Sequence, residues 1–537
     1  MLRTALCVSI FALPALAQIE LYIVEGAAAG DRFGTAVRAV GDVDADGFGD
    51  LAIGAPDSDA GALNGGQVTV ISGRTRQAIR TWTGIVAQGR YGASLAACGD
   101  LDGDGRADVV VGAPGLNGGP NGSVEVRSGA TGAVLHSWTD APGFGVALAA
   151  DGDANGDGVS DVLVGSSIAN DVWLFDGASG AVLRQHSLGG TQFGAAVAFL
   201  GDVTGDGRDE YAASDLDTWG LVRVYLGSTG GVHWTVNGGF GDELGQSLAS
   251  VSDLTGDGLP ELLVGARDEG SFGSDGRGYF SVLDGSTGAV VETVHGANPN
   301  DHLGTALAAA GDLDSDGKGD FVVSHAWLSV SGAVQVRRGS DRAVIASLPP
   351  QALDDVWGAS LAFGDVSGDG LADILVGAPL ANGNGADSGA VFVFSVVRSP
   401  TVYCQSETNS LGCVPAIGSS GVCSATSAAA FDVSAANVLN NKSGLLFYGF
   451  KPRQTPFQGG HMCIVAPTQR TPPQNSGGAA PPASDCSGAF SLDFNARIQS
   501  GVDPLLVAGE EVFAQYWSRD PADASTTNLS DALAFHI

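Results

Sequence analysis

Lysine is almost missing from this chain of 537 residues, since it occurs only at positions 318, 442 and 451. Lysine and arginine together number 25 against 59 aspartates and glutamates, which gives a formal net charge of −34. Nucleic acids and anionic membrane surfaces are held by clustered basic side chains, and this composition does not supply them. The excess of carboxylates therefore points either to solubility or to bound divalent cations.

Long apolar runs are also missing after the first residues. A basic start at Arg3 precedes an apolar run over 4–13, and Ala15-Leu16-Ala17 then fits a small-x-small cleavage pattern. We expect residues 1–17 to be a signal peptide, Gln18 to begin the mature chain, and the protein to be secreted or held at the cell surface. The run over 4–13 is too short to span a bilayer, and no later run is longer, so no membrane span is expected after cleavage.

One pattern recurs seven times: a glycine-containing pair, a short apolar strand, an acidic loop and a second apolar strand. The pairs begin at Phe33, Tyr91, Phe144, Phe193, Leu244, Leu303 and Trp357. A third strand such as 66–71 and a fourth such as 133–138 follow, so each unit has four antiparallel strands. Self-similarity near 50 residues with several short strands per unit is typical of propeller blades.

The two ends of the repeat array predict a closed ring. The seventh unit ends after its third strand, 390–394, while an unpartnered strand, 19–24, precedes the first unit. Pairing these two would remove two sheet edges. The predicted fold is therefore all-β: a seven-bladed β-propeller over residues 18–397, closed by the N-terminal strand and followed by a small β-sandwich-like domain. An open stack of repeats is the alternative.

The seven acidic loops have the chemistry of a site for a hard cation. Oxygens at positions one, three and five converge, glycine at position six permits the turn, the carbonyl of position seven can add a ligand, and an acid at position nine closes the shell. The expected ligands are Asp42, Asp44, Asp46, Phe48 and Asp50; Asp100, Asp102, Asp104, Arg106 and Asp108; Asp153, Asn155, Asp157, Val159 and Asp161; Asp202, Thr204, Asp206, Arg208 and Glu210; Asp253, Thr255, Asp257, Leu259 and Glu261; Asp312, Asp314, Asp316, Lys318 and Asp320; and Asp365, Ser367, Asp369, Leu371 and Asp373.

Irregular oxygen shells favour calcium over magnesium, and the absence of histidine and cysteine from the loops disfavours zinc. We expect up to seven calcium ions with a structural role, the alternative being solvated turns that hold no metal.

The glycine pairs, the acidic loops and the Gly-Ala-Pro runs at 54–56, 112–114 and 377–379 resemble FG-GAP repeats, the blades of the integrin alpha-subunit propeller. The resemblance covers residues 19–397 and implies structural calcium in the loops. Its adhesion role carries over less directly, because the chain has no Arg-Gly-Asp of its own.

Residues 398–402 are expected to be a linker, and residues 403–537 to form a second domain with disulfides. Apolar strands recur there, and with export its cysteines are expected to be oxidised. Tyr403-Cys404 and the run 516–521 resemble C-terminal modules of large secreted bacterial proteins. That resemblance implies the pairs Cys404–Cys413 and Cys463–Cys486, with Cys423 left free.

No convincing catalytic set is present. Ser94, Ser247 and Ser360 lie in Gly-x-Ser-x-Ala at one repeat position and are expected to be structural, as are Trp82 and its equivalents Trp138 and Trp234.

The loops between second and third strands are better ligand candidates, and they contain Arg267, Phe272, Arg277, Trp219 and Trp327. We expect an adhesion or ligand-binding module for an extracellular protein or polysaccharide, without enzymatic activity. The alternatives are a carbohydrate-active lyase or hydrolase and a structural cell-surface protein.

Overall fold

The computed structural model describes residues 16–537 apart from 116–118, 190–191, 218, 268–275, 315, 326–332, 349–355, 369–370, 399, 426, 428, 458–459, 481–483, 508–509 and 524. Gln18–Val396 forms one compact unit, and Val397–Ile537 forms the body of a second. Most of the expected signal peptide lies outside the described residues. The expected linker, 398–402, overlaps the ends of two strands, because one ends at Arg398 and the next begins at Thr401.

Seven four-stranded antiparallel sheets follow one another along the first unit. They are β2 (Ala36–Gly41), β3 (Asp50–Ala55), β4 (Gln67–Ile71) and β5 (Ala78–Thr83); β6 (Ser94–Ala97), β7 (Val109–Ala113), β8 (Gly122–Arg127) and β9 (Val134–Asp140); β10 (Phe144–Gly152), β11 (Asp161–Ser166), β12 (Asp171–Phe175) and β13 (Val182–Ser187); β14 (Phe193–Gly201), β15 (Glu210–Asp215), β16 (Leu221–Tyr225) and β17 (Val232–Asn237); β18 (Leu244–Val251), β19 (Glu261–Ala266), β20 (Tyr279–Leu283) and β21 (Val290–His295); β22 (Leu303–Gly311), β23 (Asp320–His325), β24 (Ala333–Arg337) and β25 (Val344–Leu348); and β26 (Ser360–Gly364), β27 (Asp373–Ala378) and β28 (Ala390–Arg398) with β1 (Leu16–Glu25).

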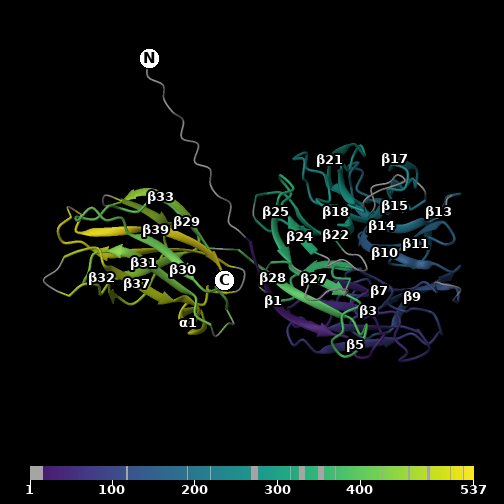
Figure 1. Cartoon of the computed structure of the whole chain (residues 1–537), viewed down its shortest axis with the longest axis horizontal. Helices are drawn as coiled ribbons and strands as arrows, with labels where there is room; N and C mark the ends of the chain where they lie inside the picture. Colours follow the sequence, from purple (N-terminus) through teal and green to yellow (C-terminus); the bar gives the residue numbers. More distant parts are fainter. Residues whose placement is uncertain are drawn as a thin grey trace, which may run out of the picture. The chain divides into compact units, whose positions relative to one another are not determined.

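These sheets close into a ring around a common centre (Figure 1). The first strands of neighbouring sheets contact one another in the order β2, β6, β10, β14, β18, β22 and β26, and β26 contacts β2 again. The N-terminal β1 pairs with β28 and supplies the fourth strand of the last sheet. The unit is thus a seven-bladed β-propeller, and the predicted closure by the N-terminal strand is confirmed.

Burial falls from the middle of each blade to its rim. All six residues of β3 are buried, and so are all six of β11, β19 and β27. Such strands are covered by a neighbouring blade on each face, which is why they read as continuous runs of valine, leucine and alanine. The outer β5 is mostly exposed or half-buried, with Trp82 as its one buried residue.

The glycines of the repeat allow neighbouring blades to meet backbone to backbone. Gly34 has a φ of +88°, and its N–H donates to the carbonyl of Gly54 in the same blade at 2.9 Å. A Cβ on Gly54 would lie 1.9 Å from the carbonyl oxygen of Gly92 in the next blade. A Cβ on Gly34 would lie 2.5 Å from the Ala390 carbonyl oxygen of the seventh blade, so each of the two glycines is required by a close contact with a neighbouring blade.

The repeated serines donate hydrogen bonds across equivalent interfaces between other pairs of blades. Ser94 Oγ donates to the carbonyl of Gly145 at 2.5 Å, and Ser360 Oγ donates to that of Gly34 at 2.9 Å. Ser247 Oγ makes the equivalent bond to Gly304 at 2.8 Å. Each hydroxyl is committed to the next blade, which confirms the structural interpretation of these serines.

Tryptophan side chains on outer strands donate hydrogen bonds to the turn between the third and fourth strands of the following blade. Trp138 Nε1 donates to the carbonyl of Gly180 at 2.9 Å, and Trp234 Nε1 donates to that of Gly285 at 2.8 Å. His186 on β13 reaches Tyr211 of the next blade, with Nε2 and the hydroxyl oxygen 2.8 Å apart, and its ring stacks on Tyr225. These contacts confirm that the tryptophans pack blades together.

The second unit has two main sheets and one short hairpin. A six-stranded sheet contains β29 (Thr401–Tyr403), β39 (Thr527–His536), β38 (Glu511–Arg519), β32 (Ser443–Gly449), β35 (Gln469–Arg470) and β36 (Gln474–Asn475); a three-stranded sheet contains β30 (Ala416–Ser420), β31 (Asp432–Val438) and β37 (Gly488–Asp493); and β33 (Pro452–Phe457) pairs with β34 (Gly460–Ile464). Helix α1 (Phe494–Gln499) begins where Asp493 accepts the Ala496 N–H.

Residues from both main sheets share one core, which includes Val433, Phe490, Leu446 and Tyr516. The unit is therefore a sandwich-like β domain.

The disulfides pair differently from the prediction: Cys404 with Cys463, and Cys413 with Cys486, at Cα–Cα distances of 6.1 and 6.3 Å. The predicted pairs Cys404–Cys413 and Cys463–Cys486 are wrong, because the segment that joins Cys404 to Cys413 is held against β39, where the Glu407 N–H donates to the Leu529 carbonyl at 2.9 Å. The Tyr403 hydroxyl donates to the Cys463 carbonyl, which places the start of this segment beside β34. Cys423 is unpaired, as expected.

Replacing Gly54 with alanine tests the contact between blades. We expect Gly54→Ala to lower the free energy of unfolding by about 1–3 kcal/mol, because the new methyl group overlaps backbone that cannot move aside. Chemical denaturation in calcium-containing buffer measures the effect. Gly189→Ala is the matched control, since a Cβ at Gly189 meets nothing within 4 Å. Equal effects of the two substitutions would contradict this account.

His186 gives the propeller a defined pH dependence. Burial, and then the charge of Arg184, lower the pKa of His186 from 6.5 to about 4. Between these values the unfolded chain binds a proton that the folded chain does not, so stability is lost as pH falls below 6.5. From pH 7.5 to 5.5 we expect wild type to lose about 1 kcal/mol more than His186→Phe. Denaturation curves at both pH values check this, and parallel losses would refute it.

Candidate functional site

The acid at position nine is the first residue of a second strand in six of the acidic loops and directly precedes β7 in loop two, and in all seven it is at most 1% exposed. Its carboxylate accepts the backbone N–H of position two at 2.5–3.0 Å in all seven loops. These acids are Asp50, Asp108, Asp161, Glu210, Glu261, Asp320 and Asp373. The closing acid therefore shapes the loop, in addition to any role as a ligand.

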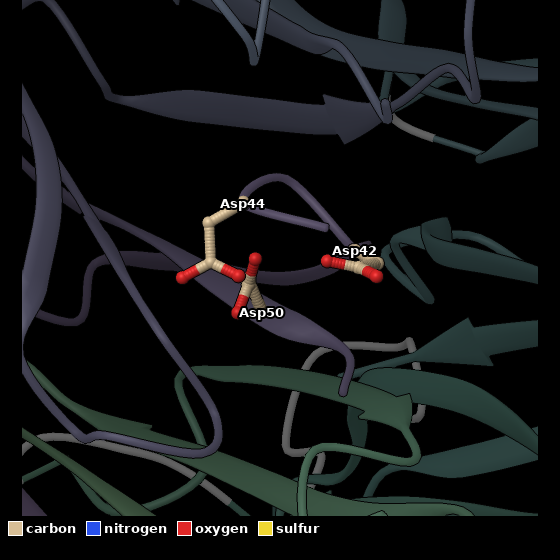
Figure 2. Close-up of side chains that lie close together, drawn as sticks. All are labelled: Asp42, Asp44 and Asp50. Atoms are coloured by element: carbon tan, nitrogen blue, oxygen red, sulfur yellow. The ribbon is translucent and has the colours of Figure 1, made fainter. Parts of the chain in front are cut away.

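Loop one brings three carboxylates together at the mouth of its hairpin (Figure 2). Oxygens of Asp42, Asp44 and Asp50 lie within 4.8 Å of one another. Asp42 accepts the N–H groups of Asp46 and Gly47 at 3.1 and 2.9 Å, which holds its carboxylate over the turn. Asp44 Oδ1 is buried and has no hydrogen-bond partner among the described residues. A buried carboxylate oxygen without a donor is what a cation ligand leaves when the cation is absent.

Three further loops gather acids in the same way among the described residues. They are loop two with Asp100, Asp102 and Asp108; loop five with Asp253, Asp257 and Glu261; and loop six with Asp312, Asp314 and Asp316. In loop seven Ser367 Oγ is buried without a partner, while the predicted ligand Asp369 lies outside the described residues. The Asp clusters could hold metal ions, and the orphaned oxygens fit that role.

Loops three and four offset part of their charge internally. The Asn155 side-chain amide donates to Asp157 at 3.1 Å and to Asp161 at 3.3 Å, so it bridges two acids of its own loop. Thr204 Oγ1 donates to Glu210 at 3.4 Å. Neither loop has a cluster of three acids within 4.8 Å among the described residues. The predicted ligand sets of these two loops are therefore less convergent than that of loop one.

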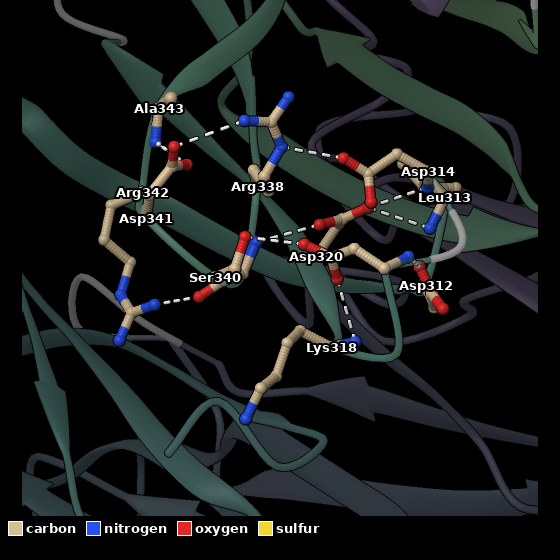
Figure 3. Close-up of polar contacts among 12 residues, drawn as sticks. Asp312, Leu313, Asp314, Lys318, Asp320, Arg338, Ser340, Asp341, Arg342 and Ala343 are labelled. Atoms are coloured by element: carbon tan, nitrogen blue, oxygen red, sulfur yellow. Dashed lines mark hydrogen bonds and ion pairs between the residues drawn. The ribbon is translucent and has the colours of Figure 1, made fainter. Parts of the chain in front are cut away.

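Basic side chains approach loops five and six. Arg338 Nε donates to Asp314 Oδ2 at 2.7 Å, and its Nη1 reaches Asp341 at 3.2 Å (Figure 3). Asp314 Oδ1 is buried without a partner in the part of the chain that the structure describes. Lys318 Nζ lies 3.9 Å from Asp253 of loop five. Loops one and two have no such ion pair among the described residues.

Position-seven side chains lie on the loop of the preceding blade. The Phe48 ring rests against Gly368 of loop seven, and Arg106 Nη1 donates to the Val43 carbonyl at 3.1 Å. The lysine at 318 lies against Gly256 in the same manner. These contacts join loop seven to loop one, loop one to loop two, and loop five to loop six, and ligation by the position-seven carbonyls stays a prediction.

Burial makes negative charge unfavourable in these loops when no cation is present. It raises the pKa of Asp50 to about 6, with the charges of Asp44 and Asp42 adding to the effect. Burial likewise raises the pKa of Asp161 to about 7 and that of Asp320 to about 6. A divalent ion would supply the opposing charge that these carboxylates lack.

The opposite ends of the strands carry the predicted ligand-binding residues. Trp219 is 55% exposed, and its ring meets the exposed ring of Phe240 edge-on, with centroids 5.4 Å apart. Arg267 is committed to an ion pair with Glu243 at 2.6 Å. The carbonyl of Arg277 accepts the Leu303 N–H at 2.9 Å. The candidates Phe272 and Trp327 lie outside the described residues.

A groove of about 410 Å³ lies between the fourth and fifth blades, and the sequence did not indicate it. Tyr279 and His295 line one side, with ring centroids 5.5 Å apart. Asp242 accepts the Tyr279 hydroxyl at 2.9 Å. The sequence gave only a weak signal for this groove, because its lining residues come from two blades and do not form one motif. Phe240 and Asp242 belong to the same connection, so the groove adjoins the exposed aromatic pair.

The family model for the FG-GAP repeat matches residues 33–71, 91–126, 244–283 and 357–394. These segments fall in the first, second, fifth and seventh blades. Each spans the glycine pair, the acidic loop and the second and third strands.

Integrin alpha subunits are among the curated relatives of this chain. The chain is 28% identical over 201 residues to integrin alpha-V of Gallus gallus, covering 33% of this chain and 19% of that protein. It is 33% identical over 156 residues to integrin alpha-IIb of Homo sapiens (26% and 15%) and 31% identical over 212 residues to integrin alpha-8 of Mus musculus (32% and 19%). The chain therefore matches less than a fifth of the length of these relatives.

Among solved structures, a chain in "Crystal structure of BBS1N in complex with ARL6DN, soaked with mercury" aligns over 71% of this chain and 96% of that chain, at 12% sequence identity and a TM-score of 0.47.

The fold and the matches together define the class of the first unit. It is a propeller with FG-GAP repeats in four of its blades, and parts of it are similar in sequence to integrin alpha subunits. No enzyme family is indicated by these relatives. Within the described residues, no helix is long and apolar enough to cross a membrane.

Proposed function

We propose that this chain is an exported adhesion or ligand-binding protein whose propeller holds calcium as a structural ion and binds an extracellular protein or polysaccharide on the opposite face. The observation that supports it best is the gathering of carboxylate oxygens within 4.8 Å in loops one, two, five and six. The N-terminal signal-peptide pattern supports export to the cell surface or the medium.

Calcium suits these loops for three reasons. Every side-chain donor in them is an oxygen, which calcium accepts in irregular shells of six to eight ligands. Several oxygens, including Asp44 Oδ1 and Asp314 Oδ1, are buried without a hydrogen-bond donor. A bound cation would also offset the repulsion among acids whose pKa is raised by burial. Its role there would be to hold the first hairpin of each blade.

Occupancy should differ between blades. Loops one and two have acids at positions one, three, five and nine and no ion pair to a basic side chain among the described residues, so they need the cation most. In loop six, Arg338 already bonds Asp314, and in loop three Asn155 bridges two acids. We therefore place the tightest sites in loops one and two.

The ligand-binding face would be the one that carries Trp219, Phe240 and the groove beside Asp242. Exposed aromatic side chains are frequent anchors of protein and sugar ligands, because they bury a large area at low entropic cost. The groove adds hydroxyl, carboxylate and amide groups from Tyr279, Asp242 and Asn237. Such a mixture suits a polar, uncharged portion of a ligand.

We expect Asp44→Asn to shift the melting temperature in opposite directions in chelator and in excess calcium. In chelator we expect the melting temperature to rise, because one charge of a crowded cluster is removed, worth about 1 kcal/mol for charges 4 Å apart in a water-like dielectric. With excess calcium we expect it to fall, because a ligand is lost; a site held at 100 times its Kd contributes about 2.7 kcal/mol. Thermal denaturation with and without calcium measures both.

Asp140→Asn, which removes an acid outside the loops, is the control. It should leave the melting temperature unchanged both in chelator and in excess calcium. A wild-type melting temperature that does not depend on calcium would refute the structural role of the ion. A fall with Asp44→Asn in chelator would refute the repulsion.

Trp219→Ala should weaken ligand binding without changing stability. The probes are immobilised cellulose, chitin, dextran, collagen and fibronectin, with retention measured in calcium. We expect retention on at least one of them, and about tenfold weaker binding for the variant, as for a typical aromatic anchor. Ile85→Ala is the matched control, since Ile85 is 83% exposed in a different blade. Failure to bind any probe, or equal loss in both variants, would count against this face.

A further inference from the structure

The groove between the fourth and fifth blades is open because the fifth blade has a small residue in the middle of its third strand. This residue is Ser281 on β20, which lines the groove and pairs with Thr293 on β21. The strand registers place larger residues at the same position in the second, third, fourth, sixth and seventh blades, namely Glu125, Trp173, Arg223, Gln335 and Phe392. The fifth blade therefore lacks a large side chain that five other blades have.

A second small residue widens the same groove. In two other blades the large residue contacts the aromatic side chain of the glycine pair: Glu125 accepts the Tyr91 hydroxyl at 3.1 Å, and Phe392 meets Trp357 edge-on with ring centroids 4.6 Å apart. The fifth blade has Leu244 in place of that aromatic residue, and Leu244 lines the groove. The hollow of about 410 Å³ is thus particular to this blade and is not a property of the repeat.

The groove offers both hydrogen-bond donors and acceptors to a ligand. The hydroxyl oxygens of Ser281 and Thr293 lie 2.9 Å apart, and since one hydrogen makes their mutual bond, the other can be donated to a ligand. At the rim, Asp242 accepts the Tyr279 hydroxyl at 2.9 Å and the Gly239 N–H at 2.5 Å. Both bonds go to Oδ2, which leaves Oδ1 of this half-buried carboxylate to accept from a ligand.

The charges of the lining residues favour a neutral ligand. None of them is lysine or arginine, so the groove has no partner for a phosphate, sulfate or carboxylate group. Its carboxylate already accepts two hydrogen bonds and does not require a cation. Leu244, Leu283 and Val290 supply apolar wall. The strand β20 is paired with β19 and β21, so its backbone cannot take up a peptide as an added strand.

We propose that this groove binds one neutral hexose residue of a polysaccharide. A hexose presents hydroxyl groups and C–H groups on one small ring, which matches a few fixed polar groups within an apolar lining. Its hydroxyls would bond Asp242 and the Ser281–Thr293 pair, and its C–H groups would pack on Leu244. This inference rests on the ligand-binding role proposed above, and it selects a sugar over a protein as the ligand of this groove.

Ligand-detected NMR of the full chain in calcium tests the site. The probes are the methyl glycosides of glucose, galactose, mannose and N-acetylglucosamine, with that of glucuronic acid as the charged counterpart. We expect saturation transfer to at least one neutral glycoside and none to the glucuronide. Ser281→Gln, which gives the fifth blade the side chain that Gln335 supplies in the sixth, should weaken binding at least about tenfold because it occupies the place of the sugar.

Thr69→Gln is the matched control. It makes the same kind of change at the equivalent position of the first blade, where Phe33 stands in place of Leu244, and it should leave binding unchanged. Asp242→Asn is a second variant, at the half-buried rim, and it should also weaken binding because the amide accepts less strongly than the carboxylate. Melting temperatures in calcium check that all three variants are folded.

The outcomes separate this site from the broader role. Retention on an immobilised polysaccharide or protein without transfer to any neutral glycoside would overturn the sugar site and leave the ligand-binding role standing. Absence of both retention and transfer would count against both proposals. Undiminished binding in Ser281→Gln and Asp242→Asn, equal loss in Thr69→Gln, or equal transfer to the glucuronide would overturn the assignment of a neutral sugar to this groove.

Discussion

The acidic loops depend on one hydrogen bond that every blade repeats. A carboxylate at position nine, buried at the start of the second strand, accepts the N–H of position two and closes the first hairpin. An amide at this place would accept less strongly, and an apolar residue would leave the N–H buried without a partner. The acid is therefore needed for the loop shape whether or not a metal binds. Once it is there, the acids at positions one to five stand within reach of it.

The acidic loops of different blades neutralise their crowded carboxylates in different ways. Loop three uses the amide of Asn155, loop six uses the guanidinium of Arg338, and loop five has Lys318 nearby. Loop one has none of these, and its Asp44 keeps an oxygen without a donor. The repeat thus preserves the geometry of the loop while the means of neutralising it varies. A cation is the simplest remaining means for the loops that consist only of acids.

The sequence predicted the features that repeat and missed those that occur once. Seven copies of one pattern defined the blades, and the offset between the two chain ends defined the closure by β1. The disulfides could not be read in this way, because the path of 404–413 depends on contacts with β39 that no local signal encodes. The groove beside Asp242 is lined by residues from two blades, so no single copy of the repeat indicates it.

The strand order of the blades also places the acidic loops, which must keep their structure, and the loops that vary from blade to blade on opposite faces of the ring. Loops between first and second strands must each close a hairpin around a buried acid, so they keep the same length, aspartate at positions one and five, glycine at position six and an acid at position nine. Loops between second and third strands, and the connections between blades, have no such duty and differ from blade to blade, as Trp219 and Phe240 show. Substituting an exposed side chain on that face, such as Trp219, costs little stability, because the closing hydrogen bonds of the acidic loops lie at the other ends of the strands. Recognition can therefore diversify there while the ring stays intact, which is why the repeat reveals the scaffold and leaves the ligand open.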